Sequence, residues 1–98
     1  MVKHMIIWKL KDEIEDKKQR ATEIKVALEG LVGKLDGLLE MKILTEAFDS
    51  SSGDIMMDST FTSNDALKAY QQSPLHQEIA NGLVRPSVQS RLSFDYKI

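Results

Sequence analysis

The strongest constraint on this 98-residue chain is the order in which two hydrophobic periods alternate along it. Four segments, 2–10, 38–47, 54–61 and 91–98, repeat apolar residues at every second position, as strands do. The intervening segments 12–37 and 63–83 repeat them every three or four positions, as helices do. The resulting order of strand, helix, strand, strand, helices, strand predicts an α+β fold. Its simplest form is a ferredoxin-like βαββαβ sandwich, a four-stranded antiparallel sheet with helices on one face.

The alternation also predicts which side chains point toward the helices. The expected core faces are Val2, His4, Ile6, Trp8 and Leu10, then Leu39, Met41 and Ile43, then Ile55, Met57 and Phe61, then Leu92, Phe94 and Tyr96. The opposite face carries an apolar strip among charged residues, made of Met5, Ile7, Leu44 and Met56. A domain of this size is often marginally stable alone, and an uncovered apolar strip favours a second copy. We expect a homodimer that forms through this open sheet face.

Helix boundaries follow from capping residues. Asp12 is expected to cap the first helix, with Glu15 three residues later as in a capping box. The helix is expected to end near Gly33 or Gly37, since either glycine can adopt a left-handed conformation. Ser63 is the expected cap of the second helical segment.

The most evident chemistry lies within FTSNDALKAYQQSPLH, residues 61–76. Pro74 fits the first position of a helix capped by Ser73, which places His76 in the first turn. The helix dipole there disfavours a charged imidazole, so His76 is expected to be neutral near pH 7. Tyr70 lies near His76 if the chain folds back at Ser73–Pro74, where one helix ends and the next begins. Two interpretations stay open: packed structural residues, or a general base beside a hydroxyl donor.

His4 is the one titratable residue on the expected core face of the first strand. It is either a histidine at the rim of the core, bonded to a backbone carbonyl, or a member of a functional site.

Composition excludes several classes of function. The net charge is −2 and the thirteen Lys and Arg are spread along the chain, so nucleic acid is not expected as a partner. There is no cysteine, which excludes disulfides and thiolate chemistry. The N-terminal apolar run is too short for a secretion signal or a membrane span, and a cytoplasmic location without membrane attachment is the default expectation. No phosphate-binding glycine loop or spaced set of metal ligands is present, so no metal site is expected.

Three stretches together resemble a known family. They are VKHMIIWKLKDE at 2–13, TFTSNDALKAYQQSPLH at 60–76 and LSFDYKI at 92–98. In their order and spacing they resemble the stress-responsive dimeric α/β-barrel (Dabb) family, and the similarity covers nearly the whole chain as one domain, residues 1–98. The resemblance implies a homodimer whose two sheets form one barrel. It also implies a pocket in each subunit between sheet and helices.

The same family includes a plant polyketide cyclase that performs an aldol cyclisation. Its working tyrosine and histidine in the helical segment, and its histidine in the first strand, match the positions of Tyr70, His76 and His4. A further histidine in the third strand of the cyclase is replaced here by Ile55. By this resemblance His76 is the general base, Tyr70 the hydroxyl donor and His4 a positioning group, and the reaction requires no cofactor.

Two functions are therefore expected, from different classes. The first is binding of an apolar, carbonyl-bearing small molecule, with cofactor-free cyclase or lyase chemistry as its catalytic form. The side chains expected to line the cavity are Ile6, Trp8, Ile55, Met57 and Leu67. The alternative is a non-catalytic structural or stress protein that acts through assembly. A metal or haem oxygenase is a weaker third interpretation, because it needs a carboxylate from Asp54, Asp58 or Glu78 without a local motif.

Overall fold

The computed structural model describes all residues from 1 to 98. Its strands are β1 (Val2–Leu10), β2 (Leu38–Leu44), β3 (Ile55–Phe61) and β4 (Val88–Lys97). Its helices are α1 (Lys17–Glu29), α2 (Asn64–Gln72), α3 (Pro74–Ile79), the π-helical turn η1 (Ala80–Val84) and the short α4 (Arg85–Ser87). None of these helices has both the length and the apolar character that crossing a membrane requires.

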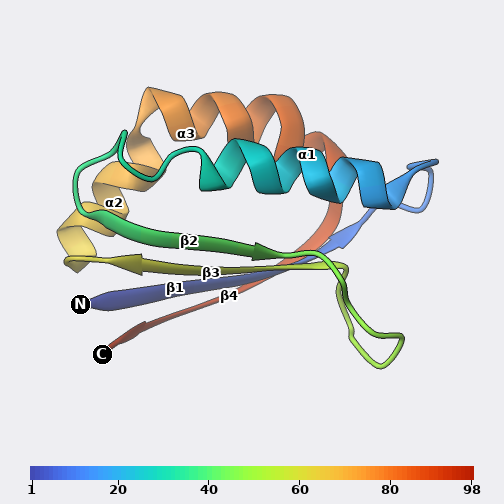
Figure 1. Ribbon diagram of the computed structural model, residues 1–98, viewed down its shortest axis with the longest axis horizontal. Coiled ribbons are helices and arrows are strands. Elements are labelled where there is room, and N and C mark those ends of the chain that lie inside the picture. Colours follow the sequence, from blue (N-terminus) through green and yellow to red (C-terminus); the bar gives the residue numbers. More distant parts are fainter.

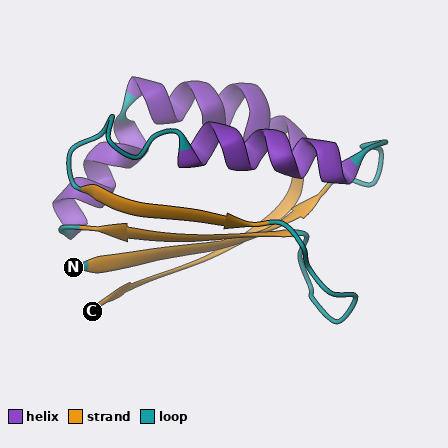
Figure 2. Ribbon diagram, viewed as in Figure 1, coloured by secondary structure: helices purple, strands orange, loops and turns teal.

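The four strands form one antiparallel sheet in the order β2-β3-β1-β4, so β2 and β4 are its edges. All the helices lie on one face of this sheet, and the other face is uncovered (Figure 1). The loop between β2 and β3 projects beyond the uncovered face, and the two chain ends lie at the same end of the sheet (Figure 2). The ferredoxin-like α+β fold predicted from the periodicity is confirmed.

The hydrophobic core lies between the sheet and the helices. Alternate residues of β1 and β3 point into it because successive side chains of a strand face opposite ways. The members contributed by the strands and by α1 are Ile6, Trp8, Leu10, Leu38, Met41, Ile43, Ile55, Met57, Phe61, Ala21, Ile24 and Leu28. Burial of these side chains holds the helices on one face of the sheet.

The caps predicted for the second helical segment are confirmed, whereas the start predicted for the first helix is wrong. Ser63 Oγ accepts from the Ala66 amide at 3.1 Å, and Ser73 Oγ accepts from the His76 amide at 3.1 Å. The helix α1 begins four residues later than expected, because Asp16 rather than Asp12 caps it by accepting from the Gln19 amide at 3.0 Å. The intervening residues form a turn instead of a helix.

The face of β2 also differs from expectation at its first residues. The pairing of β2 with β3 shifts between Leu38 and Glu40, as at a β-bulge. Leu38 is consequently 5% exposed and joins the core, while Leu39 is 49% exposed. Met41 and Ile43 are buried as predicted.

The orientation predicted for β4 is wrong. Leu92 lies opposite Ile7 and Phe94 lies opposite Met5, and directly opposed residues of paired strands point to the same face. Leu92, Phe94 and Tyr96 therefore lie on the uncovered face, not in the core, and Leu92 and Phe94 are 70% and 69% exposed. This polar-inward arrangement is tolerated because the helix side of β4 faces a cavity rather than the packed core. The strand also starts earlier than expected, at Val88.

Gly37 provides a test of the packing between β2 and α2. Its φ is +83°, and an added Cβ would lie 2.5 Å from the Ala66 Cβ and 2.9 Å from the Thr62 Oγ1. We expect Gly37→Ala to lower the free energy of unfolding by about 2–3 kcal/mol, from backbone strain and overpacking together. Gly33→Ala is the matched control, because Gly33 has φ +89° with open space around it. Urea denaturation that gives equal losses for both variants would contradict the packing contribution.

Candidate functional site

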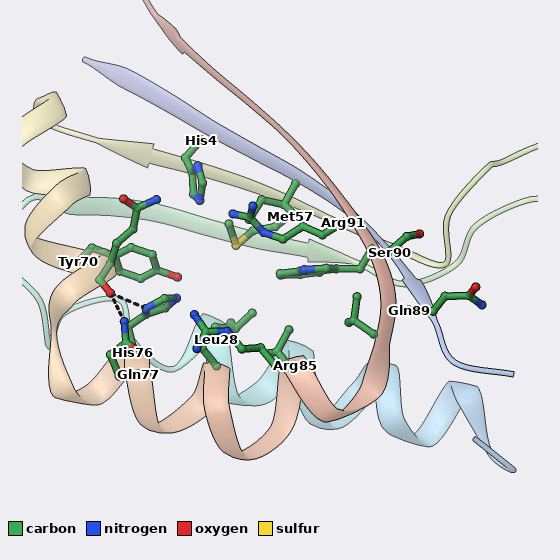
Figure 3. Close-up of a pocket in the computed structure, with 16 residues that line it drawn as sticks. His4, Leu28, Met57, Tyr70, His76, Gln77, Arg85, Gln89, Ser90 and Arg91 are labelled. Atoms are coloured by element: carbon green, nitrogen blue, oxygen red, sulfur yellow. Dashed lines mark hydrogen bonds between the residues drawn. The ribbon is translucent and has the colours of Figure 1, made fainter. Parts of the chain in front are cut away.

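A cavity of about 560 Å³ lies between the sheet and the helical segment that runs from α2 to α4. This volume is within the range of small-molecule sites. Figure 3 shows the side chains that surround it. The lining residues are His4, Ile6, Trp8, Leu28, Met57, Tyr70, Gln71, His76, Gln77, Ala80, Val84, Arg85, Val88, Gln89, Ser90 and Arg91.

Tyr70 and His76 form one wall of the cavity at the junction of α2 and α3. The break at Ser73–Pro74 folds α3 back, and the two ring centroids lie 4.4 Å apart. His76 Nδ1 lies 3.2 Å from the Gln71 carbonyl oxygen, which can only accept, so Nδ1 carries the hydrogen. Nε2 of a neutral His76 is then a free proton acceptor.

The surroundings set the charge states of this pair. Burial lowers the pKa of His76, the hydrogen bond to Gln71 opposes this, and the positive charges of Arg85 and Arg91 lower it further. Burial raises the pKa of the Tyr70 phenol, with a smaller opposite effect from Arg91. At neutral pH the cavity therefore presents a neutral imidazole beside a neutral phenol, which are a proton acceptor and a hydrogen-bond donor.

His4 reaches the same cavity from the centre of the sheet. It is 2% exposed, and its Nδ1 is hydrogen-bonded to Oδ1 of Asp95 on the neighbouring strand β4. A carboxylate on Nδ1 fixes the tautomer and the ring orientation, which leaves Nε2 on the other side of the ring. Ser59 Oγ donates to the His4 carbonyl oxygen at 2.7 Å, and both of these residues are buried.

Phe61 connects the two halves of the site. Its ring centroid lies 6.3 Å from that of His4 in an edge arrangement and 5.0 Å from that of Tyr70. Phe61 is fully buried at the end of β3. Because cores are close-packed, this ring holds His4 and Tyr70 at a fixed separation without contributing chemistry of its own.

The structure brings together most of the residues singled out in the sequence. His4, Tyr70, His76, Ile6, Trp8 and Met57 all line the cavity. Ile55 and Leu67 do not line it, contrary to expectation; each is 2% exposed and belongs to the core. The cavity lies over β1 and β4, where β3 contributes only Met57, and it meets α2 one turn beyond Leu67.

Three charged residues at the site were missed in the sequence. Arg91 and Asp95 were assigned to the outward face of β4, and the inverted orientation brings them to the helix side. Arg85, which no sequence pattern pointed to, is the first residue of α4 and lines the cavity. The sequence signal that could have indicated Arg91 and Asp95 is the alternation of the polar residues Arg91, Ser93 and Asp95 along one face of the strand.

No group of three His, Asp or Glu side chains could hold a metal ion anywhere in the chain. Of the carboxylates considered for such a site, Asp54 accepts from the Leu10 amide and Asp58 pairs with Lys3 at 2.9 Å. Both of these carboxylates therefore have structural partners away from the two histidines.

The lowered pKa of His76 predicts an acid-sensitive fold. Below the ordinary value of about 6.5, the unfolded chain binds a proton at this histidine that the folded chain does not. The free energy of unfolding should therefore decrease as pH falls from about 6.5 toward the folded pKa. We expect His76→Gln to reduce this pH dependence in denaturation measured between about pH 7.5 and pH 5. A His76 pKa at or above 6.5 in an NMR titration would contradict this account.

Together, the fold and the cavity define a small ferredoxin-like α+β domain with a His–Tyr–His pocket between sheet and helices. The chain belongs to the family of the stress responsive A/B barrel domain (Dabb), whose model matches residues 2–98. Among curated proteins, none matches this chain at a significant level.

Solved structures share the fold over almost the full length. A dimeric protein of unknown function from Bacteroides fragilis is 26% identical, with a TM-score of 0.88 and coverage of 99% of this chain and 95% of that one. A protein from Arabidopsis thaliana is 24% identical, with a TM-score of 0.82 and coverage of 100% and 95%. The hydroxynitrile lyase of Passiflora edulis is 20% identical, with a TM-score of 0.79 and coverage of 99% and 92%.

Proposed function

We propose that this protein binds an apolar small molecule that carries a carbonyl group, and that it promotes enolisation of that carbonyl without a cofactor. The observation that supports this proposal most directly is a cavity of about 560 Å³ with His4, Tyr70 and His76 on its walls. Its apolar surface, from residues such as Trp8 and Met57, suits a hydrocarbon body. Cyclase or lyase chemistry is the reaction class proposed for such a site.

Each of the three polar groups has a role in this proposal. His76, neutral and with Nε2 free, removes a proton from the carbon next to the carbonyl. The Tyr70 hydroxyl donates a hydrogen bond to the carbonyl oxygen and stabilises the enolate that forms. His4, held in one tautomer by Asp95, positions the ligand through Nε2. Electrons move from the broken C–H bond to the carbonyl oxygen, so the step needs no oxidant or reductant.

We also propose that the protein is a homodimer formed through the uncovered face of the sheet. The apolar strip of Met5, Ile7, Leu44 and Met56 is enlarged by Leu92 and Phe94, which paired strands place beside Ile7 and Met5. The similar Bacteroides fragilis structure is described as dimeric. Edge-to-edge pairing at β2 is hindered at Ile43, where the Glu29 carboxylate accepts from the backbone amide at 2.9 Å.

Benzylacetone, an uncharged ketone with an aromatic body, provides a direct test of the binding proposal. We expect it to shift the NMR signals of the His4 and His76 rings in a saturable manner. Filling the cavity by Ala80→Phe should abolish this binding, because Ala80 is a small residue on the cavity wall. Val26→Phe is the matched control, since Val26 is 68% exposed on α1 and outside the cavity. Binding that survives Ala80→Phe would refute this location, and no binding would favour the non-catalytic assembly role.

A further inference from the structure

The residues that line the cavity include two arginines and no acid, and the carboxylate nearest the site, Asp95, is hydrogen-bonded to His4. Arg85 and Arg91 both line the cavity, and none of its sixteen lining residues is Asp or Glu. The whole chain has a net charge of −2, so the positive charge at the cavity is opposite in sign to the net charge of the chain. Arg20 bonds Glu23, whereas neither Arg85 nor Arg91 forms a salt bridge. The two arginines without a carboxylate partner are therefore the two at the cavity.

The two arginines reach the cavity from different elements. Arg91 extends from β4 and Arg85 from the start of α4, and Figure 3 shows both side chains beside the space that Tyr70 and His76 border. The Arg85 side chain donates to the Asn81 side chain, a neutral partner, and the Arg91 guanidinium has no hydrogen-bond partner within the chain. Figure 3 shows the Arg91 side chain pointing from β4 toward Tyr70, and Arg91, Tyr70 and His76 all line the same cavity.

Other lining side chains are apolar and come from both the sheet and the helices: Ile6, Trp8, Leu28, Met57, Val84 and Val88. A ligand that contacts both the apolar and the cationic side chains needs an apolar body and an anionic group. A planar guanidinium binds a carboxylate through two parallel hydrogen bonds, which are stronger than neutral ones. Because Arg91 lies near the Tyr70–His76 pair, the anionic group must be close to the carbonyl.

We propose that the ligand is an apolar oxo acid whose carboxylate lies within a few bonds of its carbonyl group, with Arg91 and Arg85 binding the carboxylate. This inference rests on the proposed function, since it keeps the carbonyl at Tyr70 and His76. It adds the chemical class of the ligand and two specificity-determining residues.

Benzylpyruvate and benzylacetone test this inference, because they share an aromatic body and a ketone and differ by a carboxylate in place of a methyl group. We expect calorimetric titration to give a Kd for benzylpyruvate at least about tenfold lower than for benzylacetone. Arg91→Gln and Arg85→Gln should each reduce this ratio by raising the Kd for benzylpyruvate, and the double variant should remove it. Lys97→Gln is the matched control, because it removes a positive charge from the same strand outside the cavity.

The other outcomes distinguish the two proposals. Equal affinities for both compounds, with the His4 and His76 signals shifted by each, would overturn the carboxylate inference and leave the carbonyl site intact. Binding of neither compound would overturn both. Displacement of benzylpyruvate by lower concentrations of inorganic phosphate than of acetate would overturn the carboxylate in favour of a phosphate ligand.

Discussion

Phe94→Glu is expected to convert the proposed dimer into monomers at micromolar concentration. Phe94 is 69% exposed in the single chain, on the edge strand β4 and beside Met5 of the apolar surface. In a two-fold symmetric interface each substitution occurs twice, so two carboxylates would have to be buried without partners. We expect the dissociation constant to rise at least about a hundredfold, because burying unpaired charges is costly. Sedimentation velocity over a concentration series measures this change, and Ile7→Glu should act in the same direction.

A matched variant separates loss of the interface from a general effect of added charge. Val26→Glu adds the same charge at an exposed apolar residue on α1, in the helix layer, and should leave the dimer intact. Circular dichroism and the Tyr70–His76 signals should show a folded chain in all three variants. A dimer that persists in both Phe94→Glu and Ile7→Glu would place the interface elsewhere. Dissociation caused by Val26→Glu would point to the helix layer.

His76→Gln is expected to reduce the protein-catalysed exchange of the α-hydrogens of benzylacetone in D₂O by about a hundredfold or more. Removal of a positioned general base typically costs that much, because glutamine cannot accept the proton. Tyr70→Phe keeps the ring packed against Phe61 but removes the hydroxyl donor, and should reduce exchange by about ten- to a hundredfold. The two effects should be non-additive, because both groups act on one bound ketone. Proton NMR of the ketone measures the rate directly.

Glu78→Gln serves as the control for the exchange experiment. Glu78 is exposed on α3, two residues from His76, and does not line the cavity, so exchange should continue at the wild-type rate. If His76→Gln leaves exchange unchanged and His4→Gln abolishes it, the base is His4 with its Asp95 partner. Exchange that no cavity variant changes would show that the pocket binds without catalysis, as the assembly alternative requires.

Local rules in the sequence were sufficient for most of the fold. The change between two-residue and helical periods determined the order of elements, since each period leaves one apolar face to bury. Ser63, Ser73 and Pro74 determined where α2 and α3 begin, because capping depends on neighbouring residues only. The same local geometry placed His76 in a first helical turn. The juxtaposition of Tyr70 with His76 required only that the chain fold back at this break.

Other features depended on pairing between distant segments. An alternating strand such as 91–97 does not by itself state which face turns inward, because a shift of one residue exchanges its two faces. The register of β4 against β1 placed Phe94 on the open surface and Arg91 and Asp95 on the cavity side. Likewise, a bulge against β3 exchanged Leu38 for Leu39 in the core.

The sequence alone therefore determined the order of the elements, the caps of α2 and α3 and the identity of the two histidines and the tyrosine, because these follow from patterns within a few residues. Only the tertiary structure decided the register of β4 and the position of the cavity, and with them the Asp95 partner of His4 and the cationic wall of Arg85 and Arg91. These features arise where segments far apart in the sequence meet, as in the pairing of His4 with Asp95, which are 91 residues apart. Strand register is set by such long-range packing, which no local pattern encodes.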